Sequence, residues 1–193
     1  MMRDWTLTDA LERRQVLKEG HFQLSSGRHG TQYLQCAQLL CFPEEAEAAG
    51  IALAKLIQEE SIDLVVGPAM GGIIIAHEVA RALQLPCFFT ERKEGQMQLR
   101  RGFTIQSGSR IVVIEDVVTT GGSVKEVIQL LESAGGTVVA VGALVNRSGG
   151  PSPFAQPFHS LLELPIASYD PKECPMCAEG TPAIKPGSRE RMK

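Results

Sequence analysis

The most informative segment of the chain reads Ile111-Val112-Val113-Ile114-Glu115-Asp116-Val117-Val118-Thr119-Thr120-Gly121-Gly122-Ser123. Its four leading residues are apolar and β-branched, which predicts a buried strand over 111–114. Two adjacent carboxylates follow at the carboxyl end of that strand, and a threonine–glycine turn then leads into a predicted helix over 124–134. Because ligands bind at the carboxyl ends of strands in parallel sheets, this segment predicts a ligand site as well as a strand–turn–helix unit.

The same order of strand, glycine turn and helix recurs along the chain. Apolar runs predict further strands over 62–66, 87–89 and 138–145, and a helical stretch follows Gly71-Gly72 and runs to about Leu83. Near-continuous apolar strands that alternate with helices are typical of a mostly parallel sheet covered on both faces. The predicted fold class is therefore α/β.

Three further segments carry expectations of their own. Thr8 is expected to cap a first helix that ends at Gly20, and Pro43 to begin a second helix that runs to about Glu60. Residues 91–109 are polar, charged and spotted with glycine, which predicts an exposed loop or hairpin. A connection of that length often serves as a functional lid.

Composition limits the class of protein. The chain has 193 residues, 44% of them hydrophobic, and a formal net charge of −3, which fits one globular domain and disfavours bulk nucleic-acid binding. No run approaches the roughly 20 apolar residues of a membrane span, and the charged N-terminus does not resemble a signal peptide. Five cysteines, an odd number, are expected to be reduced thiols in the cytoplasm.

The turn after the acid pair has the chemistry of an anion site. Backbone N–H groups at a helix start bind anions, glycines allow close approach, and Thr119, Thr120 and Ser123 add hydroxyl donors. Glu115 and Asp116 would then accept hydrogen bonds from ribose hydroxyls or help to hold Mg²⁺. The alternative is a strand that ends in a solvated acidic turn before a capped helix. The GxxxxGK[ST] and GxGxxG motifs are absent at this turn.

This segment resembles the phosphoribosyl-pyrophosphate (PRPP) signature of the type I phosphoribosyltransferases, and other segments match in the same order. Residues 20–28, Gly-His-Phe-Gln-Leu-Ser-Ser-Gly-Arg, resemble the N-terminal segment of the orotate phosphoribosyltransferase family. Residues 67–72, Gly-Pro-Ala-Met-Gly-Gly, resemble its pyrophosphate-binding turn, and Arg92-Lys93 the start of its mobile catalytic loop. The resemblance covers roughly residues 10–150 and implies transfer of the phosphoribosyl group of PRPP to orotate in pyrimidine biosynthesis.

The resemblance implies three sets of site residues. Those expected to bind PRPP are Met70, Gly71, Gly72, Glu115, Asp116, Val117, Val118, Thr119, Thr120, Gly121, Gly122 and Ser123. Those expected to bind orotate are Ser25, Ser26, Gly27, Arg28, Tyr33, Thr119 and Arg147. Those expected to close over the pyrophosphate as catalytic residues are Arg92, Lys93, Arg100 and Arg101. Glu115 and Asp116 are also expected to hold Mg²⁺, largely through the ligand and water.

The resemblance also implies an architecture. We expect one phosphoribosyltransferase domain over residues 1–193, with a sheet core over about 45–147. A small hood would come from about residues 1–40 together with 150–193. The implied assembly is a homodimer in which the loop of one subunit reaches the site of the other. Its partners would be small-molecule substrates, with no nucleic acid and no membrane.

Some positions depart from the family pattern. Gln96 and Gln98 stand where many members carry a loop lysine and histidine, and lysines are common at the positions of Gly71 and Ser25. Arg100 and Arg101 are candidates to compensate. These departures keep two alternatives open: a phosphoribosyltransferase for another base, and a non-catalytic PRPP-binding regulator. A transcriptional regulator would need a DNA-binding extension, for which residues 1–20 are too short.

The C-terminal part is proline-rich and contains a cysteine pair. Eight of the eleven prolines follow Gly149, which predicts an extended tail lying on the domain or on a partner subunit. Cys174-Pro175-Met176-Cys177 has the spacing of half a zinc site, but no second CxxC or HxxxH motif accompanies it, so the pair is interpreted as structural or incidental, with zinc as the alternative. The histidines at 21, 29, 77 and 159 have no visible nucleophile partner, and His77 is expected in the core.

Overall fold

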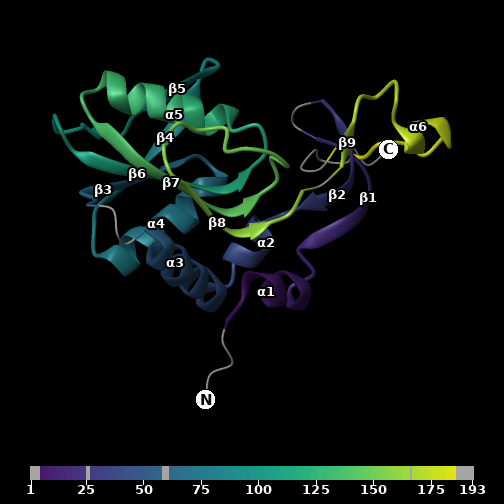
Figure 1. Cartoon of the computed structure of the whole chain (residues 1–193), viewed down its shortest axis with the longest axis horizontal. Coiled ribbons are helices and arrows are strands. Elements are labelled where there is room, and N and C mark those ends of the chain that lie inside the picture. The colour runs from purple at the N-terminus through teal and green to yellow at the C-terminus, as the bar shows by residue number, and fades with distance from the viewer. Residues whose placement is uncertain (1–4, 25–26, 58–60, 166, 186–193) are drawn as a thin grey trace.

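The computed structural model describes residues 5–24, 27–57, 61–165 and 167–185. Two sheets organise these residues: a large body is built on a six-stranded sheet, and a smaller part is built on a three-stranded sheet (Figure 1). The N-terminal helix lies below the junction of the two parts, and the last described residues lie in the smaller one (Figure 1).

The six-stranded sheet confirms the α/β class. Its strands, in spatial order, are β5 (Gln96–Leu99), β4 (Cys87–Lys93), β3 (Leu64–Pro68), β6 (Arg110–Val118), β7 (Thr137–Asn146) and β8 (Phe158–Glu163). All neighbouring strands are parallel except β4 and β5, which form an antiparallel hairpin. The expected hairpin in the 91–109 segment is therefore present.

Helices cover both faces of this sheet because its central strands are apolar on both sides. On β6, Val112 and Ile114 pack in one buried cluster with α3 (Pro43–Ile57) and α4 (Gly71–Leu83), beside the short α2 (Ala37–Leu40). Ile111 and Val113 point the other way and pack with α5 (Gly122–Ser133). This alternation is the consequence of the period-two geometry of a strand.

The small sheet joins segments from opposite ends of the sequence. Its strands are β1 (Leu17–Gln23), β2 (His29–Leu34) and β9 (Ser168–Tyr169), all antiparallel. The short helix α6 (Pro175–Ala178) follows β9, and Ile184 forms a bridge with Phe22 of β1. The small sheet is thus made from segments near both ends of the chain.

The start of the chain corrects one expectation. Helix α1 spans only Leu7–Arg13, and the hydroxyl of Thr6, not of Thr8, caps it by accepting a hydrogen bond from the Asp9 backbone N–H. The segment that contains Gly20 is strand β1. The apolar residue Leu17 therefore pairs with Leu34 of β2 instead of extending the helix.

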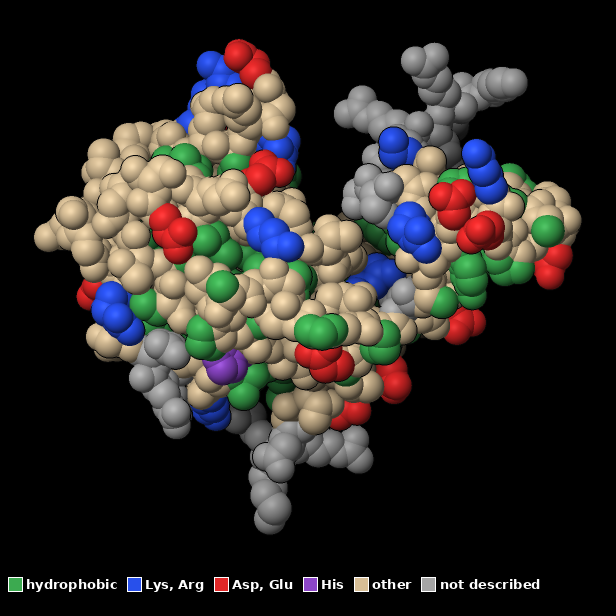
Figure 2. Space-filling view, turned by 45° about the horizontal axis from the view of Figure 1, so that its top comes forward, with side chains coloured by type: hydrophobic (Ala, Val, Ile, Leu, Met, Phe, Trp, Pro, Cys, Tyr) green, Lys and Arg blue, Asp and Glu red, His purple; other side chains and the backbone are tan. Residues whose placement is uncertain are grey.

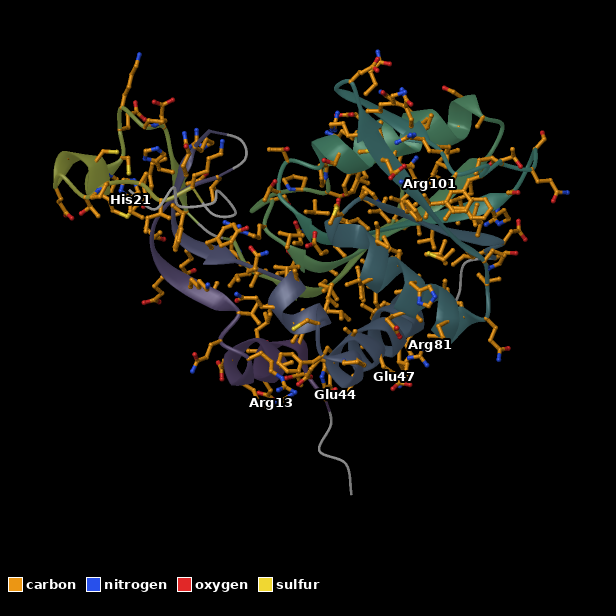
Figure 3. The ribbon with its side chains drawn as sticks, turned by 180° about the vertical axis from the view of Figure 1, so that it is seen from behind. Arg13, His21, Glu44, Glu47, Arg81 and Arg101 are labelled. Carbon is orange, nitrogen blue, oxygen red and sulfur yellow. The ribbon has the colours of Figure 1, made fainter. Side chains whose placement is uncertain are left out.

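A buried carboxylate attaches α1 to α3. Glu45 is 3% exposed and accepts hydrogen bonds from Trp5, Arg13 and Arg14 at 2.9 to 3.2 Å. Burial acts to raise its pKa, but these donors outweigh that effect and lower the pKa of Glu45. Arg13 and the neighbouring Glu44 lie where the two helices meet (Figure 3).

Two further expectations are wrong. The proline-rich tail is not merely extended, because β8 lies parallel to β7 and continues the large sheet beyond the expected core boundary at residue 147. The side chain of His77 is 67% exposed, since the buried face of α4 consists of Gly72, Ile75, Ala76, Val79 and Ala80. Among the described helices, none has the length and apolar character needed to cross a bilayer.

Candidate active site

A cavity of about 540 Å³ lies between the large body and the small sheet. Figure 2 shows the corresponding hollow, with Lys or Arg side chains at its floor and on its walls. Residues of both parts line it: Leu24, Arg28, Tyr33, Leu34 and Ser168 from the small part, and Asp116, Val117, Thr119, Thr120, Arg147 and Ser148 from the large body. The structure therefore brings the expected base-binding and PRPP-binding residues together at one site.

A second cavity of about 280 Å³ surrounds the turn between β6 and α5. Its lining consists of Glu115, Val117, Val118, Thr119, Thr120, Gly121, Gly122, Ser123, Val124 and Glu126. Gly121 has φ +73°, a conformation that favours glycine, and a Cβ there would lie 2.8 Å from the Phe154 ring. The first backbone N–H groups of α5 have no intrahelical acceptor, so this cavity is suited to a phosphate.

Glu115 and Asp116 stand at the end of β6, between the two cavities. The Asp116 backbone N–H donates to Glu115 Oε1 at 3.0 Å, and the Val117 N–H donates to Asp116 Oδ1 at 2.8 Å. Burial, helped by the negative charge of Asp116, raises the pKa of Glu115 to about 9. Burial also raises the pKa of Asp116. The pair therefore holds a proton near neutral pH until a cation or hydroxyl donors compensate its charge.

The start of α4 lies directly against this acid pair. A Cβ at Gly71 would lie 2.6 Å from Asp116 Oδ2, and a Cβ at Gly72 would lie 2.8 Å from the Ile114 carbonyl oxygen. No side chain fits at position 71 while Asp116 keeps this place, so this contact favours glycine there. The glycines let the start of α4 approach the acid pair this closely. The side chain of Met70, which precedes them, is 84% exposed.

Two arginines and a tyrosine line the larger cavity. Arg147 is half-buried after β7, and its Nε is buried with no hydrogen-bond partner among the described residues. Burial lowers the pKa of Arg147 and raises that of Tyr33. Arg28 donates to the hydroxyl of Ser168 at 2.9 Å and to its carbonyl at 2.6 Å. A planar carboxylate fits the unpaired donor of Arg147.

The expected catalytic arginines do not reach either cavity within the described chain. Arg92 donates to the Gly95 carbonyl and to Glu126, which itself lines the smaller cavity. Arg100 and Arg101 pair with Glu91 at 3.3 and 2.7 Å. Lys93 lies at the end of β4, in the same hairpin.

The remaining expected residues need separate mention. Ser25 and Ser26 lie outside the described residues, and Gly27, with φ +81°, lies in the turn that precedes Arg28. Sequence reasoning missed Ser168, which binds Arg28 although 140 positions separate the two residues. No local signal in the proline-rich tail points to Ser168, because its role arises only from the β2–β9 pairing.

Comparison with known proteins agrees with this geometry. The family model described as "Phosphoribosyl transferase domain" matches residues 36–168. The chain is 52% identical over 183 residues to the orotate phosphoribosyltransferase of Thermotoga maritima, covering 95% of this chain and 98% of that protein. It is 54% identical over 179 residues to the orotate phosphoribosyltransferase of Carboxydothermus hydrogenoformans, covering 92% and 94% respectively.

A solved structure extends the agreement to three dimensions. The crystal structure of orotate phosphoribosyltransferase from Aeropyrum pernix superposes with a TM-score of 0.70 at 28% identity, covering 82% of this chain and 94% of that one. Sequence and fold therefore both relate this chain to the same enzymes. This relationship also accounts for the acid pair, the glycine turn and the two-part cavity. This chain belongs to the phosphoribosyltransferase family, and within it to the orotate phosphoribosyltransferases.

Proposed function

We propose that this protein transfers the 5-phosphoribosyl group of PRPP to orotate in pyrimidine biosynthesis. The bond from the anomeric carbon to the pyrophosphate oxygen breaks as the bond to the orotate ring nitrogen forms, giving orotidine 5′-monophosphate and pyrophosphate. The observation that carries the proposal is the pair of adjoining cavities. One surrounds the start of α5, whose first N–H groups suit an anion, and the other is lined by Arg147, Arg28 and Tyr33 between the small sheet and the large body.

We assign each part of the substrates to a place in the two cavities. The 5′-phosphate would occupy the smaller cavity, with the N–H groups and hydroxyls of residues 119–123 as donors. Asp116 and Glu115 would accept hydrogen bonds from the ribose hydroxyls, and the N–H groups of Gly71 and Gly72 would face the pyrophosphate. The orotate carboxylate would pair with Arg147 in the larger cavity, covered by Arg28 and Tyr33. Fixed positions of this kind lower the barrier chiefly through orientation and electrostatics.

The acid pair also fits a magnesium ion. Carboxylate oxygens are the ligands that Mg²⁺ prefers, and burial raises the pKa of both carboxyl groups, so a bound cation would favour their ionised form. Glu115 and Asp116 would hold the ion, mainly through the ligand and water. When bound, Mg²⁺ supplies neutralisation of the charge that develops on the departing pyrophosphate.

The position of the hairpin supports a dimeric enzyme. Arg100 and Arg101 are 42% and 59% exposed and pair only with Glu91 among the acidic side chains described, away from both cavities of their own chain. We propose that these arginines act in the site of a second subunit of a cytoplasmic homodimer. There they would supply the positive charge that Gln96 and Gln98 lack, and the closed hairpin would exclude water.

The deciding experiment is consumption of orotate by the purified protein with PRPP and Mg²⁺, run beside uracil, adenine and hypoxanthine. We expect turnover with orotate and none with the other three bases. Turnover with one of the others would retain the PRPP site but contradict the proposed role of Arg147. PRPP binding without turnover of any base would contradict the enzyme proposal and favour a PRPP-responsive regulator.

A further inference from the structure

The fold gathers two histidines and two cysteines in the small part, far from the acid pair. His21 of β1, His29 of β2, and Cys174 and Cys177 at α6 each offer one ligand atom, and these atoms all lie within 4.8 Å of one another. His21, His29 and Cys174 are buried, whereas Cys177 lies at the surface. Figure 3 shows His21 in this part of the molecule, beside the C-terminal segment.

The spacing of the ligand atoms is that of a tetrahedral metal site. His21 Nε2 lies 3.4 Å from Cys174 Sγ and 3.8 Å from Cys177 Sγ, and His29 Nδ1 lies 3.3 Å from Cys177 Sγ. Zinc bonds of about 2.0–2.1 Å to nitrogen and about 2.3 Å to sulfur give a tetrahedron whose nitrogen–sulfur edge is roughly 3.6 Å. The two histidine nitrogens are 2.8 Å apart and need to separate by only about half an ångström to reach a tetrahedral edge.

The hydrogen bonds around His21 orient its ring as in a metal ligand. Its Nδ1 lies 2.7 Å from the Thr181 carbonyl oxygen, a contact that requires the proton on Nδ1 and leaves the lone pair of Nε2 directed at the two cysteines. Histidine ligands of metals are usually oriented by such a bond from the other ring nitrogen. The Thr181 N–H donates in turn to the Met176 carbonyl, inside the cysteine loop.

We propose that His21, His29, Cys174 and Cys177 bind one structural zinc ion within a single chain. Four protein ligands of the type N₂S₂ in tetrahedral spacing suit zinc, and they leave no position open for a substrate. The ion would fasten the C-terminal segment to β1 and β2, beside the backbone bonds that Ile184 makes with His21 and Gln23. Because Arg28, which directly precedes β2, and Ser168 of β9 line the larger cavity, the ion would stabilise the cover of the base-binding site.

The first test is the zinc content of the full-length chain, produced without a histidine tag and purified without chelator. We expect about one zinc per chain, and less than about a tenth of that in the Cys174→Ser/Cys177→Ser variant. Cys41→Ser is the matched control, because this exposed thiol donates only to the Gln38 carbonyl and lies outside the cluster. It should keep the full zinc content.

Histidine variants separate this site from its competitors. His21→Asn/His29→Asn should also lose the zinc, whereas His159→Asn should keep it. Zinc retained by the double histidine variant, at about half an ion per chain, would instead indicate four thiolates from two chains and would overturn the proposal. A Cys174–Cys177 disulfide in the freshly purified protein, detected by thiol titration and mass, would overturn it too.

A measurement on the unaltered chain tests the site even where the variants fail to fold. Protein produced in cobalt-supplemented medium should show thiolate-to-cobalt charge-transfer absorption and the intense visible bands of tetrahedral cobalt. Unaltered protein that is folded by circular dichroism yet binds neither zinc on dialysis nor cobalt in this form would refute the site.

Discussion

The protonation of Glu115 is a property of a single residue with a measurable consequence for stability. Its pKa lies near 9 in the folded chain and near 4.5 as a free group, so between these values the folded state binds a proton that the unfolded state does not. The free energy of unfolding therefore falls as the pH rises through this window. Without a bound ligand or cation, the buried acid pair therefore lowers the stability of the folded protein.

Glu115→Gln should remove this pH dependence. We expect the variant to gain stability over the parent as the pH rises from 5 to 8, by on the order of 1–3 kcal/mol, while its activity falls because the carboxylate is lost. Thermal unfolding at several pH values measures the difference. Glu12→Gln, at an exposed position of α1, is the control and should track the parent. A stability difference that does not change with pH would contradict the assignment.

Arg147 makes a second prediction at the residue scale. Its buried Nε has no partner among the described residues, so a ligand carboxylate would satisfy it. Arg147→Ala should lower kcat/KM for orotate by about 10- to 100-fold, the value of one charge-assisted hydrogen bond, and should change KM for PRPP far less. Arg81→Ala removes an exposed arginine that pairs with Glu47 and Glu78, and should leave both constants unchanged. An equal loss for both substrates would argue against a specific role in orotate binding.

At the scale of an element, the start of α5 depends on a glycine. Gly121 combines a positive φ with contact to the Phe154 ring, whereas Gly108 has a similar φ of +82° and a Cβ there would have nothing within 4 Å. Alanine substitution at both positions therefore separates the free-energy cost of the backbone conformation from that of packing against Phe154. The turn that lines the smaller cavity is therefore packed against Phe154, more than 30 residues further along the chain, as well as held by its own residues.

Gly121→Ala should destabilise the protein more than Gly108→Ala does. The backbone conformation alone costs about 1–2 kcal/mol at either site, and overpacking against Phe154 adds about 1–3 kcal/mol at position 121. Each kcal/mol lowers Tm by about 2–4 °C in a chain of this length. Differential scanning calorimetry of the two variants gives the comparison. Equal Tm losses would mean that Phe154 moves aside without cost.

The N-terminal elements show where local sequence patterns fail to predict secondary structure. The polar and apolar residues of 7–20 suit a helix, yet only Leu7–Arg13 is helical and Leu17–Gln23 is a strand. His21 and Phe22 become buried because β1 pairs with β2 and the C-terminal segment closes over it. Tertiary contacts decided this segment, whereas the α3, α4 and α5 helices were predictable from Pro43, the glycine turns and the apolar spacing.

At the scale of the whole molecule, the separation of the arginine hairpin from both cavities predicts complementation between subunits. The Arg147→Ala chain has an intact hairpin, and the Arg100→Ala/Arg101→Ala chain has an intact base site. Each variant alone should have little activity. In a mixed dimer, the intact hairpin of one chain would meet the intact base site of the other, so co-expression should restore activity to one site.

The complementation experiment has a clear contrary result. If the arginines act within their own chain, no mixture contains a complete site, and the activity of co-expressed variants will equal the mean of the two alone. Size-exclusion chromatography with light scattering gives the oligomeric state of the same samples. As a control, Arg81→Ala co-expressed with the hairpin variant should show activity from Arg81→Ala homodimers and mixed dimers.

The local order of residues was enough to predict the α/β class, the central strands and helices, the acid pair and the anion turn. These features depend on periodicity and on side chains within a few positions of each other. Only the tertiary structure decided the place of β8, the Arg28–Ser168 contact, the pairing of the hairpin arginines with Glu91, and the union of His21 and His29 with Cys174 and Cys177. Each joins side chains through strand pairing or surface packing, and no local pattern encodes which distant segment will complete a sheet.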